Sequence, residues 1–228
     1  HSFPTRRSSD LSSSLGEYSI ALGRYASSGG MFSLAQGDRS NAAGLNATAV
    51  GSNSNAAGAK AIALGNAAKA TEIMSIALGD TANASKEYSM ALGVSSAASA
   101  ANAIAVGRNS AAAGVDSLAL GRLSVASAAN AIAMGAESEA AENATAIGNN
   151  AHAKGVNSIA MGSGSIADKV NTIALGNGSQ SLADNAIAIG QGNKANGTDA
   201  IALGNASLSS GLNSIALGKT SVVTGDNS

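Results

Sequence analysis

The tetrapeptide Ile62-Ala63-Leu64-Gly65 returns as Ile76-Ala77-Leu78-Gly79 and again as Ile201-Ala202-Leu203-Gly204. It belongs to a longer repeat in which a glycine follows an aliphatic–Ala–aliphatic triplet, with few departures. These glycines are Gly23, Gly37, Gly51, Gly65, Gly79, Gly93, Gly107, Gly121, Gly135, Gly148, Gly162, Gly176, Gly190, Gly204 and Gly218. Thirteen of their fourteen intervals are 14 residues long, and the interval from Gly135 to Gly148 is 13. A fixed period of this kind predicts a repeat architecture.

Each repeat has the pattern of two short strands joined by turns. In Ser75-Ile76-Ala77-Leu78 the large side chains are two residues apart, so they share one face of a strand and Ala takes the other. A second strand has Ser or Ala at alternate positions, as at Ser110 and Ala112, and the turns hold the glycines, Asn and nearly all the charges. Identical coils stacked on one another predict a parallel β-solenoid, or β-roll, of about fifteen coils. We expect the large aliphatic residues, Ile159 and Met161 among them, to point inward.

The alanine found two residues before every repeat glycine leaves two interpretations open. A face of methyl groups lets another surface approach closely, and the favoured interpretation is that self-association buries this face. The other is that Ala fills a cramped space inside the roll. The periodicity does not decide between them.

A helix is the main alternative fold, since 14 residues also make two heptads. A helical seam needs apolar residues three and four apart, whereas the large ones here are two apart. Glycine would also cost a helix about 1 kcal/mol at each interior position. The one short repeat fits the strand model, because its missing residue falls near Glu142 and Asn143, in a turn. A loss there leaves the register of the strands intact.

The composition limits the kind of core and the kinds of ligand. Of the 228 residues, 45% are hydrophobic, but there are only three Tyr, two Phe and no Trp, so we expect a thin interior. A net charge of −1 without a basic stripe argues against nucleic acid. The absence of cysteine excludes disulfides and thiolate metal sites. No apolar run reaches the roughly 20 residues of a membrane-spanning helix.

No group of residues predicts catalysis. His152 is the only histidine after the first eleven residues, and we expect it to be exposed near a turn. The glutamates within 137–142 are interpreted as solvated turn residues. The Gly-rich segments 162–165 and 190–193 follow strands but precede no helix, so they are turns and not phosphate-binding loops. We therefore predict no enzyme, no cofactor and no metal.

The two ends of the sequence are expected to differ in kind. Residues 1–11, HSFPTRRSSDL, do not fit the repeat and contain the only proline. They are interpreted as a foreign, adapter-derived segment and predicted to be disordered. Residues 12–228 are predicted to be one run of repeats, a fragment truncated at both ends.

The repeat resembles the head repeats of trimeric autotransporter adhesins, the YadA-like kind, whose signature runs Asn-Ser-Val-Ala-Ile-Gly-x-x-Ser. Close matches are Asn157-Ser158-Ile159-Ala160-Met161-Gly162 followed by Ser165, and Asn213-Ser214-Ile215-Ala216-Leu217-Gly218 followed by Ser221. The resemblance covers residues 12–228 in continuous register. It implies an all-β, left-handed parallel β-roll of 14-residue coils, with three chains around a common axis.

The resemblance also implies a function. The resemblance implies that the chain is an adhesin head on the outer membrane of a Gram-negative bacterium. Such a head would attach the cell to host extracellular matrix proteins such as collagen, fibronectin and laminin, and would also mediate cell-to-cell aggregation. The motif carries a ligand-binding role onto Asn157, Ser158, Ser165, Asn213, Ser214 and Ser221. Membrane attachment would come only through a C-terminal anchor that is missing from this sequence.

Four other functions are compatible with a repeat solenoid in general. Acyltransferases built on a left-handed β-helix need coils of about 18 residues and a catalytic histidine, which disagrees with this period. Ice-binding solenoids need a regular Thr-x-Thr array, and calcium-binding solenoids need repeated Asp-containing turns. Neither pattern is present. A rigid spacer that displays a separate binding domain remains open as the alternative.

Overall fold

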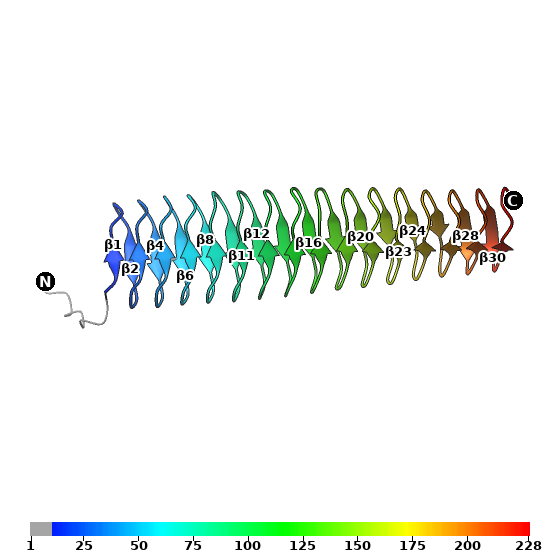
Figure 1. Cartoon of the computed structure of the whole chain (residues 1–228). Coiled ribbons are helices and arrows are strands. Elements are labelled where there is room, and N and C mark those ends of the chain that lie inside the picture. The colour runs from blue at the N-terminus through cyan, green and yellow to red at the C-terminus, as the bar shows by residue number, and fades with distance from the viewer. Residues whose placement is uncertain (1–10) are drawn as a thin grey trace, which may run out of the picture. The chain divides into compact units, whose positions relative to one another are not determined.

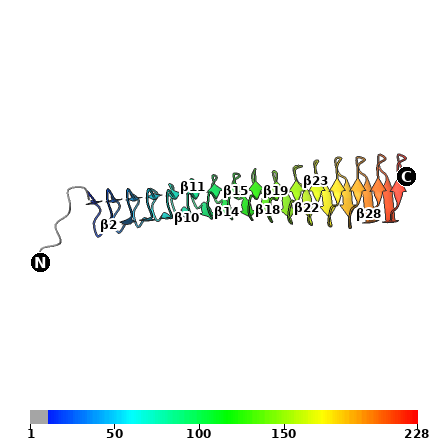
Figure 2. The ribbon, with the colours of Figure 1, turned by 90° about the horizontal axis from the view of Figure 1, so that it is seen from below.

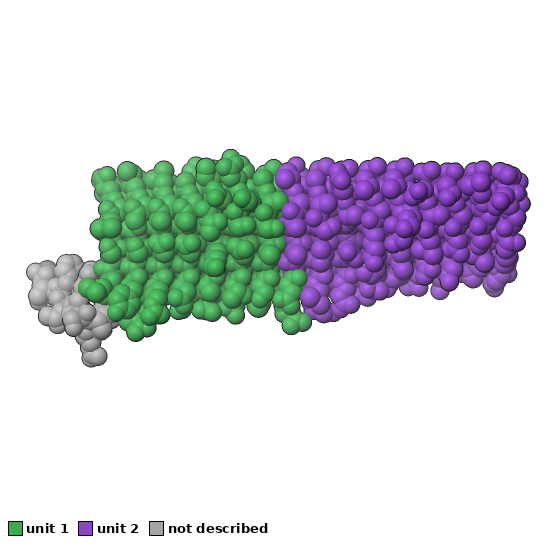
Figure 3. Space-filling model, viewed as in Figure 1, with its two compact units in different colours: residues 1–109 green, residues 110–228 purple. Residues whose placement is uncertain are grey.

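The computed structural model describes residues 11–228. The segment predicted to be disordered, apart from Leu11, lies outside the described residues. Regular structure in the described part of the chain consists of β-strands, and no helix there could span a membrane. The chain divides into two compact units, His1–Asn109 and Ser110–Ser228, coloured separately in Figure 3. We call them unit 1 and unit 2.

In unit 1 the odd-numbered strands form one parallel sheet and the even-numbered strands form a second. The odd-numbered strands are β1 (Ser13–Ser14), β3 (Ser27–Ser28), β5 (Asn41–Ala42), β7 (Asn55–Ala56), β9 (Lys69–Ala70), β11 (Asn83–Ala84) and β13 (Ala97–Ala98). The even-numbered strands are β2 (Ile20–Leu22), β4 (Leu34–Gln36), β6 (Thr48–Val50), β8 (Ile62–Leu64), β10 (Ile76–Leu78), β12 (Met90–Leu92) and β14 (Ile104–Val106).

Unit 2 repeats this two-sheet arrangement. Its odd-numbered strands are β15 (Ala111–Ala112), β17 (Val125–Ala126), β19 (Glu139–Ala140), β21 (His152–Ala153), β23 (Ile166–Ala167), β25 (Gln180–Ser181), β27 (Lys194–Ala195), β29 (Leu208–Ser209) and β31 (Val222–Val223). Its even-numbered strands are β16 (Leu118–Leu120), β18 (Ile132–Met134), β20 (Thr145–Ile147), β22 (Ile159–Met161), β24 (Ile173–Leu175), β26 (Ile187–Ile189), β28 (Ile201–Asn205) and β30 (Ile215–Lys219).

Within each unit, the coils stack so that each residue lies next to the same position of the neighbouring repeat. Between β8 and β10, for example, Ala77 pairs with Ala63. The amide of Gly79 donates to the carbonyl of Leu64 at 2.8 Å. Figures 1 and 2 show the two layers of short parallel strands from two directions. The predicted all-β parallel solenoid is confirmed, and the described residues contain no helical segment.

The interior of each coil is lined by small side chains, which corrects the predicted orientation. Ala160 is 0% exposed, whereas its neighbour Ile159 is half-buried and Met161 is 41% exposed. The same holds along both units, where the alanines of the even-numbered strands are buried almost throughout. Short turns hold the two sheets so close together that little more than a methyl or hydroxymethyl group fits between them. The prediction that Ile159 and Met161 point inward is therefore wrong, and so is the prediction that self-association buries the alanines.

Serine side chains inside the coil satisfy the backbone of the turns. The hydroxyl of Ser54 donates to the carbonyl of Gly51 at 2.9 Å, and that of Ser75 donates to the carbonyl of Glu72 at 2.7 Å. Such short-range bonds to backbone carbonyls favour turns over regular structure. They let the coil bury polar side chains without leaving the carbonyls of tight turns unpaired.

The repeat glycine is required by the close stacking of the coils. Gly79 has a φ of 136°, in a region that side chains strongly disfavour, and a Cβ there would lie 2.5 Å from the carbonyl oxygen of Gly93. Each coil therefore packs its glycine against the backbone of the next one.

The 13-residue repeat keeps its strands in register, as predicted. Thr145 in β20 pairs with Ile132 on one side and Ile159 on the other. The turn at 141–144 has one residue fewer than the corresponding turns of other coils. The deletion is therefore absorbed in the turn, and stacking continues through it.

Candidate binding surfaces

The outward side chains of the even-numbered strands form an apolar surface, which we call the aliphatic face. It consists of the first and third residues of each strand β2 to β14 in unit 1 and β16 to β30 in unit 2. Most are Ile, Leu, Met or Val, and many stay accessible: Leu78 is 45% exposed and Leu203 is 40% exposed. A contiguous apolar surface of this kind marks an interaction site on a soluble protein.

The outward side chains of the odd-numbered strands are smaller and more polar. In unit 1 the amide of Asn41 donates to the side-chain oxygen of Asn55 at 2.9 Å. In unit 2 His152 Nδ1 lies 3.2 Å from Glu139 Oε2, and Lys154 Nζ lies 3.9 Å from the same oxygen. The side chain of His152 is 23% exposed, so this residue is half-buried on β21 and not in the exposed environment predicted for it. Among residues 11–228, no His, Cys, Asp and Glu side chains gather closely enough to hold a metal ion.

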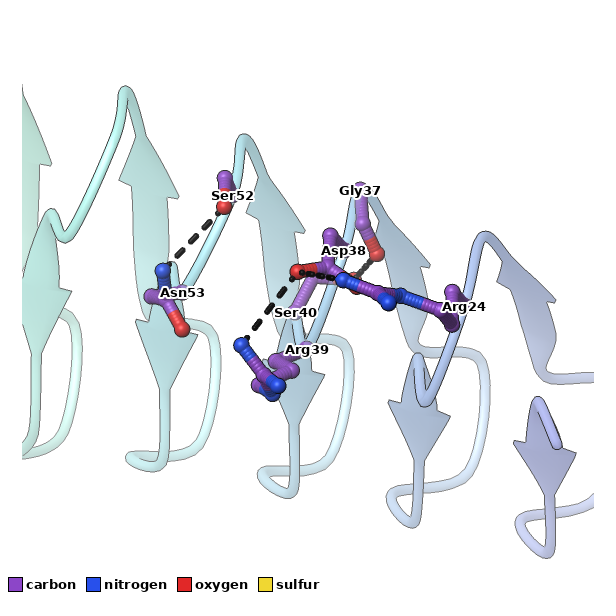
Figure 4. Close-up of polar contacts among 7 residues, drawn as sticks. All are labelled: Arg24, Gly37, Asp38, Arg39, Ser40, Ser52 and Asn53. Carbon is purple, nitrogen blue, oxygen red and sulfur yellow. Dashed lines mark hydrogen bonds and ion pairs between the residues drawn. The ribbon is translucent and has the colours of Figure 1, made fainter. Parts of the chain in front are cut away.

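The turns that follow β2 and β4 in unit 1 carry a charged group around Asp38, shown in Figure 4. Arg24 donates to Asp38 through Nε at 2.7 Å, and Arg39 Nη1 lies 3.5 Å from the same carboxylate. The hydrogen bond from Arg24 lowers the pKa of Asp38 below its usual value, and the positive charges of Arg24 and Arg39 add to this effect. The guanidinium carbons of the two arginines lie 5.8 and 5.9 Å from the ring centre of Tyr25. We call Arg24, Tyr25, Asp38 and Arg39 the arginine cluster.

The turns that lead into the even-numbered strands of unit 2 are linked by amide side chains. The residue in left-handed conformation is Asn or Asp in each of these turns. Asn171 accepts a hydrogen bond from Asn157 at 3.2 Å and donates one to Asn185 at 3.2 Å, and Asn185 donates to Asp199 at 2.9 Å. Asn and Asp tolerate the left-handed conformation better than other residues with side chains. Unit 2 therefore has a ladder of polar side chains along this edge.

Several of the equivalent turns of unit 1 hold large apolar side chains instead. Tyr18 and Phe32 occupy the left-handed position with φ of 55° and 56°, and their rings stack with centres 5.2 Å apart and planes 7° from parallel. They are 72% and 53% exposed. Met74 and Tyr88 occupy the same position three and four coils after Phe32, and both are exposed. We call Tyr18 and Phe32 the aromatic pair.

The serines of the predicted ligand motif lie mostly inside the coil. Ser158, Ser165 and Ser214 are 0% exposed. Ser165 donates to the carbonyl of Gly162 at 2.8 Å, so it acts within its own turn. Ser221 is half-buried.

The asparagines of the same motif are exposed. Asn157 and Asn213 belong to the left-handed turns of unit 2, where Asn213 donates to Asn227 at 3.1 Å. The two asparagines are therefore accessible to a ligand, whereas three of the four serines are buried inside the coil. The ligand-binding role of the six residues stays a prediction.

Sequence reasoning missed the aromatic pair and the arginine cluster. A signal for both was present, because Tyr18 and Phe32, like Arg24 and Asp38, are 14 residues apart. In a stacked solenoid, residues one period apart are neighbours. Reading the charges and aromatic residues in columns of that period would have placed them together.

Two comparisons relate the chain to known proteins. The family model of the YadA head domain repeat matches residues 28–54, 42–68, 56–82, 70–96, 84–110, 112–138, 140–165, 167–193, 182–207, 195–221 and 209–228. The crystal structure of the collagen-binding domain of the Yersinia adhesin YadA is similar, with 23% identity over 82% of this chain and 74% of that chain and a TM-score of 0.29. No curated protein matches the chain.

Proposed function

Because the chain belongs to the family built from YadA head domain repeats, we propose that it is the head of a trimeric adhesin. In this proposal three copies pack their aliphatic faces around a common axis, and the assembly is displayed on the surface of a Gram-negative bacterium. It attaches the cell to host extracellular matrix, with collagen as the first ligand to test and fibronectin and laminin as others. It also holds sister cells together. The proposal assigns the chain no catalytic activity.

The exposed aliphatic face is the observation that best supports the proposed trimer. Each coil buries its alanines and serines, so the interior of a single chain contains almost no large side chain. The isoleucines and leucines that could stabilise the fold lie on the outside, where burial of each would contribute about 1.5–3 kcal/mol. A second surface that covers this face gains that energy, and a closed ring of identical copies is the common way to supply it.

The outer faces that remain accessible in such a trimer are the ones available to matrix proteins. These include the odd-numbered strands, where polar side chains gather, as at Asn41 and Asn55. Because similar surface recurs from coil to coil, weak contacts would add up along the head and among the three copies.

A spacer role is the second candidate, and one observation favours it. Motif serines such as Ser165 and Ser214 donate hydrogen bonds to backbone carbonyls inside the coil. Asn157 donates a hydrogen bond to Asn171 in the ladder of unit 2. Much of the motif therefore serves the fold, as a spacer would require.

The trimer is tested by sedimentation of the wild-type chain and of a variant with Leu64→Asn and Leu78→Asn. Both leucines lie on the aliphatic face, so the variant should sediment as a folded monomer while the wild type sediments as a trimer. Lys69→Asn, on the opposite sheet, is the matched control and should stay trimeric. A wild-type chain that sediments as a folded monomer would refute the trimer.

Binding to immobilised collagen, fibronectin and laminin then separates the two functions. An adhesin head should bind at least one of them as a trimer and lose most of that binding in the monomeric variant, because avidity is lost. A stable trimer that binds none of the three contradicts the adhesin function and supports the spacer.

A further inference from the structure

The aliphatic face of the first coils is flanked by two different groups of side chains. Tyr18 comes two residues before Ile20, and Arg24 comes two residues after Leu22, so strand β2 lies between them. The same spacing recurs around β4. The aromatic pair therefore borders the aliphatic face on one side of unit 1, and the arginine cluster borders it on the other.

The aromatic pair lies where a single chain gains little from it. A bulky residue in left-handed conformation is strained, and such strain costs of order 1–3 kcal/mol. Tyr18 and Phe32 nevertheless take this conformation and remain largely exposed, and their rings stack on each other. Strained, exposed apolar side chains beside an apolar face are expected where another molecule covers them.

The rotational symmetry of the proposed trimer determines which surface covers the aromatic pair. In a closed ring of three copies every contact is heterologous, so one side of a copy meets the opposite side of the next. With the aliphatic faces turned to a common axis and the chains parallel, the first coils of all copies lie at one level. The side that carries the aromatic pair then faces the side of the neighbour that carries the arginine cluster.

We propose that Tyr18 and Phe32 bind the arginine cluster of a second copy of this chain. This inference rests on the proposed trimer and names a contact that fixes how its copies are joined. Guanidinium groups stack on aromatic rings and are attracted by their electron-rich faces. Arg39 contacts the carboxylate of Asp38 at 3.5 Å and its side chain remains 59% exposed, so its guanidinium is accessible to a second copy.

Cysteine cross-linking tests the contact directly, because the natural sequence has no cysteine. Phe32→Cys and Arg39→Cys are introduced together into the full chain. Within one chain the strand β4 separates the two positions by roughly 10 Å, too far for a disulfide, which needs Cα atoms closer than about 7 Å. Mild oxidation should therefore give covalent trimers on a non-reducing gel. Phe32→Cys with Thr81→Cys, three coils away, should give none.

A second measurement does not depend on cysteine chemistry. Phe32→Asn keeps a residue suited to the left-handed turn, so the coil should still fold. Loss of three symmetric cation–aromatic contacts should raise the trimer dissociation constant about tenfold or more. Met74→Asn removes an apolar residue from the same kind of turn, away from the arginine cluster, and should change the constant by less than about twofold.

The outcomes separate this inference from the proposed function. A trimeric wild type whose Phe32/Arg39 pair does not cross-link, or whose Phe32→Asn and Met74→Asn variants dissociate alike, overturns the contact and leaves the trimer standing. A monomeric wild type overturns the trimer and the contact together.

Discussion

The two units build the same turn with different side chains. In unit 2 the left-handed residue before each even-numbered strand is Asn or Asp, and several are joined by side-chain hydrogen bonds, as between Asn171 and Asn185. In unit 1 the same position holds Tyr18, Phe32, Lys60, Met74 and Tyr88 as well as two asparagines. One backbone conformation therefore tolerates both sets. The turns of unit 2 are satisfied within one chain, whereas those of unit 1 expose apolar groups that a partner could cover.

The two units share the same narrow interior, and substitutions there should give the largest change in the free energy of unfolding. Ala77→Leu in unit 1 and Ala160→Leu in unit 2 each force a large side chain into a space that holds a methyl group, and both alanines are 0% exposed. We expect each to lower the free energy of unfolding by about 3 kcal/mol, the upper end for overpacking. Chemical denaturation measures it.

The matched control for the interior is Ile159→Leu, next to Ala160 but on the outside, which should change the free energy of unfolding by less than about 0.5 kcal/mol. If leucine is tolerated at position 160, or in only one of the two units, the coils do not share one narrow interior.

Exchanging the left-handed turn residues between the units should change the stability of each coil by a smaller amount, with opposite sign in the two units. Asn171→Phe loses two ladder hydrogen bonds and puts a bulky residue in left-handed conformation, so it should destabilise its coil by about 1–2 kcal/mol. Phe32→Asn relieves that strain and should stabilise its own coil by up to about 1 kcal/mol. Amide hydrogen exchange in these coils measures both, at chain concentrations too low for association.

The comparison between units would fail if both exchanges destabilise equally, because Phe32 would then be held by its own chain. Asn46→Phe serves as a control within unit 1. It introduces the same strain as Asn171→Phe but breaks no ladder of the kind found in unit 2. The difference between these two variants measures the ladder itself.

Most of the fold could be predicted from the 14-residue period of the sequence. It predicted the parallel strands, their register and the turn that absorbs the missing residue near Glu142. The direction of the side chains could not be predicted in the same way. Alternation places Ile159 and Ala160 on opposite faces but does not say which face is inside. The distance between the two sheets decides that, and it depends on turn geometry. The family assignment survives this error because it rests on the repeat and its motif.

The candidate surfaces were less predictable than the fold. The pairing of Arg24 with Asp38 follows from the 14-residue spacing alone, once the coils are known to stack. The exposure of Tyr18 and Phe32 follows only from their place in a left-handed turn, which the sequence Glu-Tyr or Met-Phe does not indicate. Contacts with another copy depend on symmetry, which a single sequence does not encode in any local pattern.

The smallest expected effect concerns Asp38, whose unit 2 counterpart is the ion pair between Arg122 and Glu137. The hydrogen bond from Arg24, and then the charges of Arg24 and Arg39, lower the pKa of Asp38 below its usual value of 3.8. A lowered folded-state pKa means that the pair stabilises the protein at pH above 3.8 and that this contribution is lost as the pH falls through the folded value. Because the group is solvent-exposed, the change in stability is small, and the carboxyl pKa itself is the better quantity to measure.

In an NMR titration, Arg24→Gln should raise the pKa of Asp38 toward 3.8 and Arg39→Gln should raise it less, since only Arg24 supplies the main hydrogen bond. Arg108→Gln, remote from Asp38 on the same side of unit 1, should leave it unchanged. An unaltered pKa of Asp38 in Arg24→Gln would mean that Arg39, and not Arg24, is the main partner of this carboxylate.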